Sequence, residues 1–149
     1  MTELNHAKSF RDLVVYQKAK KVSREIFEIS KSFPREEIYS LTNQIRRASR
    51  SIGAQIAEAW AKRRYERHFV SKLTDADAEQ METQHWVDEA VECEYLDSKQ
   101  AEEFTEELLQ IGQMLNSMID KAPSFCGKDS FVVREDAEEH EECIVKIVG

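Results

Sequence analysis

The sequence predicts an all-α protein, an up-down-up-down antiparallel four-helix bundle with an acidic C-terminal extension. Its 149 residues include only 4 glycines and 2 prolines, the residues that most often interrupt regular structure. Four segments of roughly 24 to 30 residues repeat apolar side chains at spacings of three and four, separated by short breaks. We expect a flexible N-terminus over residues 1–9, the bundle over 10–122, and an acidic tail or short hairpin over 123–149.

The first helix is expected over residues 10–33. Ser9 and Asp12 have the spacing of a capping box, with Asp in the position usually held by Glu. Its apolar line consists of Leu13, Tyr16, Ala19, Val22, Ile26, Ile29 and Phe33. Pro34 should end this helix, because a proline disfavours helical backbone in the residue before it.

The second helix is expected to open at Pro34 and to end near residues 62–64. Glu36 and Glu37 suit its first turn, where carboxylates interact favourably with the helix dipole. Its apolar seam consists of Ile38, Leu41, Ile45, Ala48, Ile52, Ile56 and Ala59. Gly53 costs about 1 kcal/mol of helix propensity relative to alanine, so we expect a close contact with a neighbouring helix there.

The third helix is expected over residues 65–95. Its seam consists of Phe69, Leu73, Ala76, Gln80, Thr83, Val87 and Ala90. Polar residues crowd its middle, between Asp75 and His85. Because unpaired polar groups are costly in a core, we expect either a buried hydrogen-bond network or a seam that faces another subunit.

The fourth helix is expected to follow a turn and cap at residues 96–98 and to end at Pro123. Its seam consists of Ala101, Phe104, Leu108, Ile111, Leu115, Met118 and Ala122. Beyond Pro123, two β-prone runs at 131–133 and 143–148 flank an acidic block at 135–142. These runs permit a short hairpin, and a mobile acidic tail is the alternative because a lone hairpin is marginal in water.

Charge is divided unevenly along the chain. Residues 1–72 hold 16 Lys and Arg against 8 Asp and Glu, whereas residues 73–149 hold 5 against 21. The net charge of −8 argues against an indiscriminate polyanion binder. The asymmetry indicates a polyanion-facing surface or self-association between unlike surfaces, and solvated helix faces are the simpler alternative.

The cysteines and the apolar runs indicate a soluble, cytoplasmic protein. Cys93, Cys126 and Cys143 are odd in number and form no paired motif, which argues against a disulfide framework and fits a reducing compartment. The N-terminus lacks the apolar core of a secretory signal. No apolar run approaches the ~18 residues needed to cross a membrane, so we expect no membrane partner.

Candidate metal and catalytic residues are few. Glu82 and His85 form an ExxH pair, which di-metal bundles use in duplicate with further glutamates. The second pair is missing, with only Glu58 and Glu79 as further ligands, so we expect a structural polar network and no metal. His68, His85 and the cysteines match no catalytic motif, and no glycine-rich phosphate loop is present. We expect no cofactor and no catalytic residues, and therefore no enzyme.

Basic residues of the second helix and its C-terminal end form the candidate binding site. They are Arg46, Arg47, Arg50, Lys62, Arg63, Arg64 and Arg67. Arg46 and Arg50 share a helix face one turn apart, and guanidinium groups suit phosphate because they donate in a fixed fork. Further basic residues on the first helix are Lys18, Lys20, Lys21 and Arg24. Carboxylates of the third and fourth helices are alternative partners for the same arginines.

The sequence resembles a known bacterial family at four separated segments. These are FRDLVVYQKA (10–19), FPREEIYSLTNQIRRASRSIGAQIAEA (33–59), METQ (81–84) and QIGQMLNSMI (110–119). The family consists of four-helix bundle proteins often encoded in intervening sequences of 23S ribosomal RNA genes, also called S23 ribosomal proteins. The resemblance implies a bundle over about residues 10–122, a homopentamer and no established enzymatic activity, and it matches the basic positions Arg46 and Arg47.

A relative of that family, the accessory variability determinant of diversity-generating retroelements, forms a pentameric barrel that binds a reverse transcriptase and nucleic acid. The resemblance and the charge pattern lead us to expect a non-enzymatic oligomeric scaffold. Its basic helix face would contact RNA, DNA or a reverse-transcriptase-like partner. The alternative is a protein–protein interaction module whose basic and acidic halves serve homo-oligomer assembly, without nucleic-acid binding.

Overall fold

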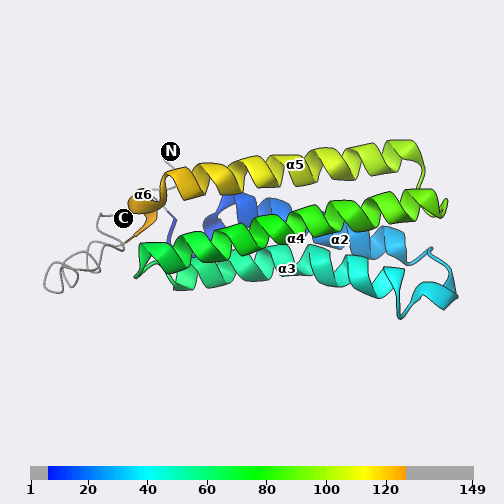
Figure 1. Cartoon of the computed structure of the whole chain (residues 1–149), viewed down its shortest axis with the longest axis horizontal. Helices are drawn as coiled ribbons and strands as arrows, with labels where there is room; N and C mark the ends of the chain where they lie inside the picture. Colours follow the sequence, from blue (N-terminus) through cyan, green and yellow to red (C-terminus); the bar gives the residue numbers. More distant parts are fainter. Residues whose placement is uncertain (1–6, 127–149) are drawn as a thin grey trace, which may run out of the picture.

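The computed structural model describes residues 7–126, which form the expected antiparallel four-helix bundle (Figure 1). In chain order the elements are η1 (Phe10–Asp12), α2 (Val14–Ser30), η2 (Arg35–Glu37), α3 (Leu41–Ala61), α4 (Glu66–Glu92), α5 (Ser98–Asp120) and α6 (Ala122–Phe125). Residues 1–6 of the expected flexible N-terminus and residues 127–149 of the expected tail or hairpin lie outside the described residues.

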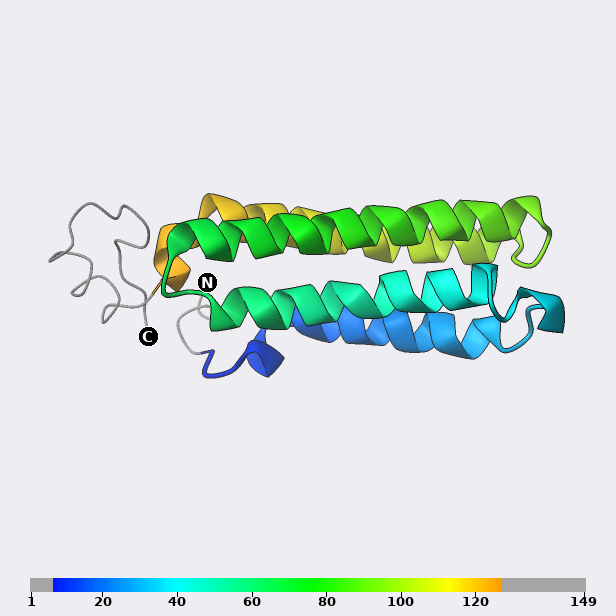
Figure 2. The same ribbon diagram turned by 60° about the horizontal axis from the view of Figure 1, so that its bottom comes forward.

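Consecutive long helices pack side by side around the bundle. The most extensive contact joins α3 to α4, and the least extensive of the four main contacts joins α2 to α5. Helices α3 and α5 therefore occupy opposite corners. In the view turned about the long axis of the bundle, α2 and α3 form one side and α4 and α5 form the other (Figure 2).

The predicted apolar seams form the core. All seven seam residues of α4 are buried, which confirms the helical spacing along that element. In α3 the seam is buried from Leu41 to Ala59, but Ile38 is 43% exposed. The prediction for Ile38 is wrong because α3 begins only at Leu41, after η2 and a turn.

The first predicted helix is interrupted near its start. Ser9 and Asp12 form the predicted capping box, but this box opens the short η1. Leu13 then adopts extended backbone angles, with φ −74° and ψ 132°, and buries its side chain. The prediction of a single helix over 10–33 is therefore wrong. Because Leu13 is buried, η1 turns back and packs against α2 and α3. Helix α2 then ends at Ser30.

Both prolines open short helices rather than bounding long ones. Pro34 precedes η2, a single turn, and not α3 itself. Pro123 lies in the first turn of α6, while α5 already ends at Asp120. Within α6, Phe125 packs on Phe69 of α4 with ring centroids 5.4 Å apart. The core therefore extends beyond the expected bundle boundary at residue 122.

The described cysteines differ in state. Cys126 is buried next to α6 and is disulfide-bonded, although the cysteine count argued against a disulfide framework. Cys93, at the end of α4, is a free and exposed thiol. One disulfide-bonded cysteine is not a disulfide framework, so the predicted reducing compartment stays a prediction.

A buried hydrogen-bond network fills the polar middle of α4. The Gln80 side chain donates to Asp77 Oδ1 at 2.9 Å and accepts from Gln84 Nε2 at 2.8 Å. Thr83 donates to a backbone carbonyl one turn earlier at 2.8 Å. Gly112 of α5 packs directly against the Gln80 amide. The predicted network is confirmed, and these polar groups are paired within the chain.

Candidate nucleic-acid interface

Two arginines of α3 stack on one phenylalanine of α2. The guanidinium carbons of Arg46 and Arg50 lie 4.6 and 5.2 Å from the ring centroid of Phe27, and Lys31 Nζ lies 5.0 Å from it. Arg46 Nε also donates to Ser30 Oγ at 2.8 Å. Stacking attracts a cation to the ring face and leaves guanidinium N–H groups available for an oxyanion.

Arg47 lies on a different side of α3. It is exposed, and its charge lowers the pKa of Glu79 on α4, although burial and the neighbouring Glu82 raise that pKa overall. Adjacent helical residues are turned by about 100° around the axis. The structure therefore divides the first arginine cluster, with Arg46 and Arg50 toward α2 and Arg47 toward α4.

None of these three arginines has a carboxylate partner within residues 7–126 at salt-bridge distance. The only acid of α3, Glu58, pairs with Lys72 of α4 at 2.8 Å. Lys72 also donates to Gln55 of α3 at 3.1 Å. The predicted alternative of ion pairing with the third and fourth helices is thus not formed by these arginines in the described part of the chain.

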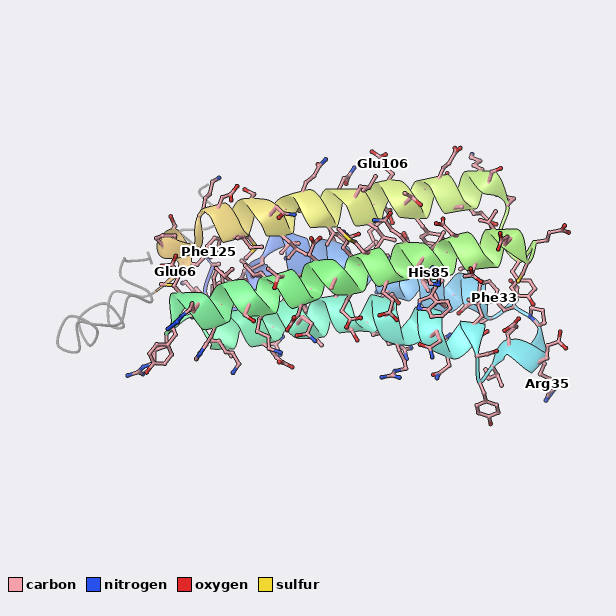
Figure 3. All side chains as sticks on the ribbon, viewed as in Figure 1. Phe33, Arg35, Glu66, His85, Glu106 and Phe125 are labelled. Carbon is pink, nitrogen blue, oxygen red and sulfur yellow. The ribbon has the colours of Figure 1, made fainter. Side chains whose placement is uncertain are left out.

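The second basic cluster sits at the turn between α3 and α4. Glu66, the first residue of α4, lies at the end of the bundle opposite to Arg35 of η2 (Figure 3). From Arg50 to Lys62 the chain advances by about 18 Å at 1.5 Å per residue. The two predicted clusters are therefore not brought together, and the second one belongs to the end of the bundle.

Arg63 has a structural role at that turn. Its guanidinium lies 3.7 Å from the Trp60 ring centroid and its Nε donates to the Trp60 carbonyl at 2.8 Å. Burial lowers the pKa of Arg63. Lys62, Arg64 and Arg67 are exposed. Arg63 thus packs on the last turn of α3, while its three neighbours face the surface.

Phe27 and Lys31 were not among the predicted site residues. Phe27 falls outside the apolar line of the first helix, since it follows Ile26 directly, and it is only half-buried. Phe27 lies four residues before Lys31, a spacing that lets a lysine reach an aromatic ring one turn away. This pattern is only a weak sequence signal that the ring binds cations. The residues that complete the arrangement, Arg46 and Arg50, lie on another helix.

The ExxH pair does not point into the bundle. Glu82 and His85 are exposed on α4, and His85 lies on its outer surface in Figure 3. Glu82 accepts a hydrogen bond from Trp86 Nε1 at 3.1 Å, and the His85 ring meets the Trp86 ring edge-on at 4.7 Å. Among the described residues, no group of three or more His, Cys, Asp and Glu could hold a metal ion.

Basic and acidic residues occupy opposite sides of the bundle. Helices α2 and α3 contain 7 Lys and Arg against 3 Glu, whereas α4 and α5 contain 3 Lys and Arg against 13 Asp and Glu. Glu106 projects from the outer edge of α5 (Figure 3). Lys21 of α2 bridges the two sides by pairing with Glu25 and with Glu107 of α5, each at 2.8 Å.

Most of the chain is similar to known proteins of one family. The family model for the 23S rRNA-intervening sequence protein matches residues 11–117. A protein of unknown function from the S23 ribosomal protein family of Bacteroides thetaiotaomicron, known from a crystal structure, is 30% identical to this chain and superposes on it with a TM-score of 0.66. The matched region covers 72% of this chain and 96% of that protein's chain. No curated protein matches the sequence. No described helix is long and apolar enough to span a membrane.

Proposed function

Because this chain belongs to the 23S rRNA-intervening sequence protein family, we propose that it is a non-enzymatic helical scaffold that binds RNA through the arginines of α3, chiefly Arg46 and Arg50 on the side toward α2. The observation that carries the proposal is that Arg46, Arg47 and Arg50 lack carboxylate partners within residues 7–126. Unpaired guanidinium groups at a surface are suited to phosphate oxygens.

The charge distribution supports binding at one place on the surface. The net charge of −8 opposes general adsorption of a polyanion, so affinity must come from a local concentration of cations. Arg46 and Arg50 are held on the Phe27 ring, which lowers the conformational entropy lost on binding. The mechanism is electrostatic: phosphate contacts release counterions, and affinity falls with salt.

A salt titration with a labelled structured RNA tests this function. Fluorescence anisotropy between about 50 and 200 mM salt should give an affinity that falls steeply for the wild type, and the R46A/R47A/R50A variant should lose roughly two to three units of the salt slope. The matched control is R35A/K99A/K121A, which removes three exposed cations away from these arginines. Absence of wild-type binding at the lowest salt would refute the function.

Self-association is the second candidate, and the opposed charges of the two sides favour it. The basic face of α2 and α3 in one copy could meet the acidic face of α4 and α5 in the next. Such a head-to-tail contact closes into a ring when the rotation allows it, in keeping with the homopentamer that the resemblance implies. Light scattering of the wild type and of R46A/R47A/R50A separates the candidates: loss of the oligomer in the variant favours assembly. A reverse-transcriptase-like protein is a further proposed partner of the same face.

A further inference from the structure

We propose that RNA lies in the groove between α2 and α3, where Lys20 and Arg24 of α2 join Arg50 of α3 in binding the phosphodiester backbone of a single strand. This inference rests on the proposed function, because it takes RNA as the ligand. It extends the site from the arginines of α3 to the space between α2 and α3, which lie side by side in Figure 2.

The groove has a volume of about 470 Å³ and a distinctive lining. Its residues are Phe10, Tyr16, Ala19, Lys20, Ser23, Arg24, Arg50, Gly53, Ala54 and Ala57. Ala54 and Ala57 are small side chains on its α3 side, while the Tyr16 ring of α2 covers Gly53. Three of the ten lining residues are cations and none is a carboxylate. The groove between α2 and α5, in contrast, is lined by six glutamates and three cations.

Helical spacing separates the charges of α2 between these two grooves. Lys20 and Arg24 are one turn apart and line the α3 side, and Arg24 also borders the α5 side. The two acids of α2 are engaged elsewhere: Glu25 pairs with Lys21 at 2.8 Å, and Glu28 pairs with Lys31 at 3.2 Å. Neither Lys20 nor Arg24 has a carboxylate partner within residues 7–126.

The row of cations continues beyond the groove. Past Arg50 it reaches Phe27, on which Arg46 and Lys31 also stack. From Lys20 to Lys31 the row follows α2 for about 17 Å. Glu28 pairs with Lys31 at the far end of this row, so the cations without a carboxylate partner in residues 7–126 are Lys20, Arg24, Arg50 and Arg46. Such a row complements a chain of phosphates, and a groove between two packed helices admits one strand rather than a duplex. An acidic segment of a second copy is the competing occupant, and the experiment below distinguishes it.

The test compares variants of the two sides of α2. Anisotropy is measured with a labelled 20-nucleotide single-stranded oligouridylate and with a duplex RNA, in low and moderate salt. In the K20A/R24A variant we expect single-strand affinity at about 50 mM salt to fall roughly 10- to 100-fold, as the loss of two phosphate contacts predicts. The control is K18A/K21A, which removes two cations of the same helix whose partners, Gln110 and Glu107, lie on α5; it should bind nearly as well as the wild type.

Each other outcome overturns a distinct claim. If K20A/R24A binds like the wild type while R46A/R47A/R50A does not, the groove is wrong and the proposed function stands. Equal losses in K20A/R24A and K18A/K21A would mean nonspecific attraction, and tighter wild-type binding of the duplex would exclude a single-strand groove. If the wild type binds neither RNA, the proposed function fails too. A lower mass for K20A/R24A by light scattering, with unchanged RNA affinity, would make the groove a subunit interface.

Discussion

Replacing each of two buried or half-buried glycines with alanine tests the helix contacts on opposite sides of the bundle. Gly53 lies in the middle of α3 and Gly112 in the middle of α5. Both substitutions remove the same unfavourable helix propensity, about 1 kcal/mol. Their surroundings differ, so the two variants should shift the free energy of unfolding in opposite directions.

The magnitudes follow from the space around each glycine. A Cβ atom at Gly112 would lie 2.8 Å from Gln80 Nε2 and 3.2 Å from Asp77 Oδ1. Gln80 must therefore move and give up its bonds in the buried network, at a cost of roughly 1 to 3 kcal/mol for each polar group left unpaired. A Cβ atom at Gly53 would lie 3.4 Å from the Tyr16 ring, an ordinary contact. We expect G112A to lose roughly 1 to 2 kcal/mol and G53A to gain about 0.5 to 1 kcal/mol.

Both effects are measured by thermal and urea unfolding, monitored by circular dichroism. All variants are compared at one protein concentration, because assembly would make Tm concentration-dependent. For a chain of this size the expected shifts are a few degrees in each direction. The Q80A background supplies the control: without the Gln80 amide, G112A should become neutral or stabilising. If G112A raises Tm as G53A does in the wild-type background, the Gln80 contact does not constrain α5.

Four further outcomes are expected. Y95F removes the 2.7 Å bond to Glu37 and should lower Tm at neutral pH but not at acid pH, where Glu37 is protonated. In the wild type, the Tyr95, Ser40 and Leu41 bonds lower the pKa of Glu37, and Glu37 raises the pKa of Tyr95 to about 12. Their contribution to stability should therefore be lost as pH falls through the lowered Glu37 pKa and as pH rises from about 10 toward 12. I52A, at a fully buried site, should cost about 2 to 5 kcal/mol in urea unfolding. F27L keeps every charge but removes the ring on which Arg46 and Arg50 stack, so RNA affinity should fall in the anisotropy titration while the salt slope stays nearly constant.

The long helices could be predicted because helix formation and burial follow local periodicity. The α4 seam from Phe69 to Ala90 is buried throughout, since residues three and four apart share one face. Helix ends were less predictable. The extended backbone at Leu13 and the late start of α3, which leaves Ile38 exposed, depend on how the chain turns to reach the core.

The candidate site was predictable only in part. The shared face of Arg46 and Arg50 follows from their spacing on one helix. Their common contact with Phe27 depends on the register of α2 against α3, which the turn through η2 sets. Helical spacing places Arg63 beside Trp60, three residues earlier. The bond from Arg63 Nε to the Trp60 carbonyl could not be predicted, because it forms where α3 ends at Ala61.

By itself, the sequence determined the four helices, their buried faces and the division of charge between a basic and an acidic half. Each of these properties depends on residue type and short-range spacing. Only the tertiary structure decided which cations face each other across α2 and α3, and which ones already have partners, such as Lys21 with Glu107. Those contacts join residues far apart in the chain, so they depend on helix register and packing rather than on local pattern.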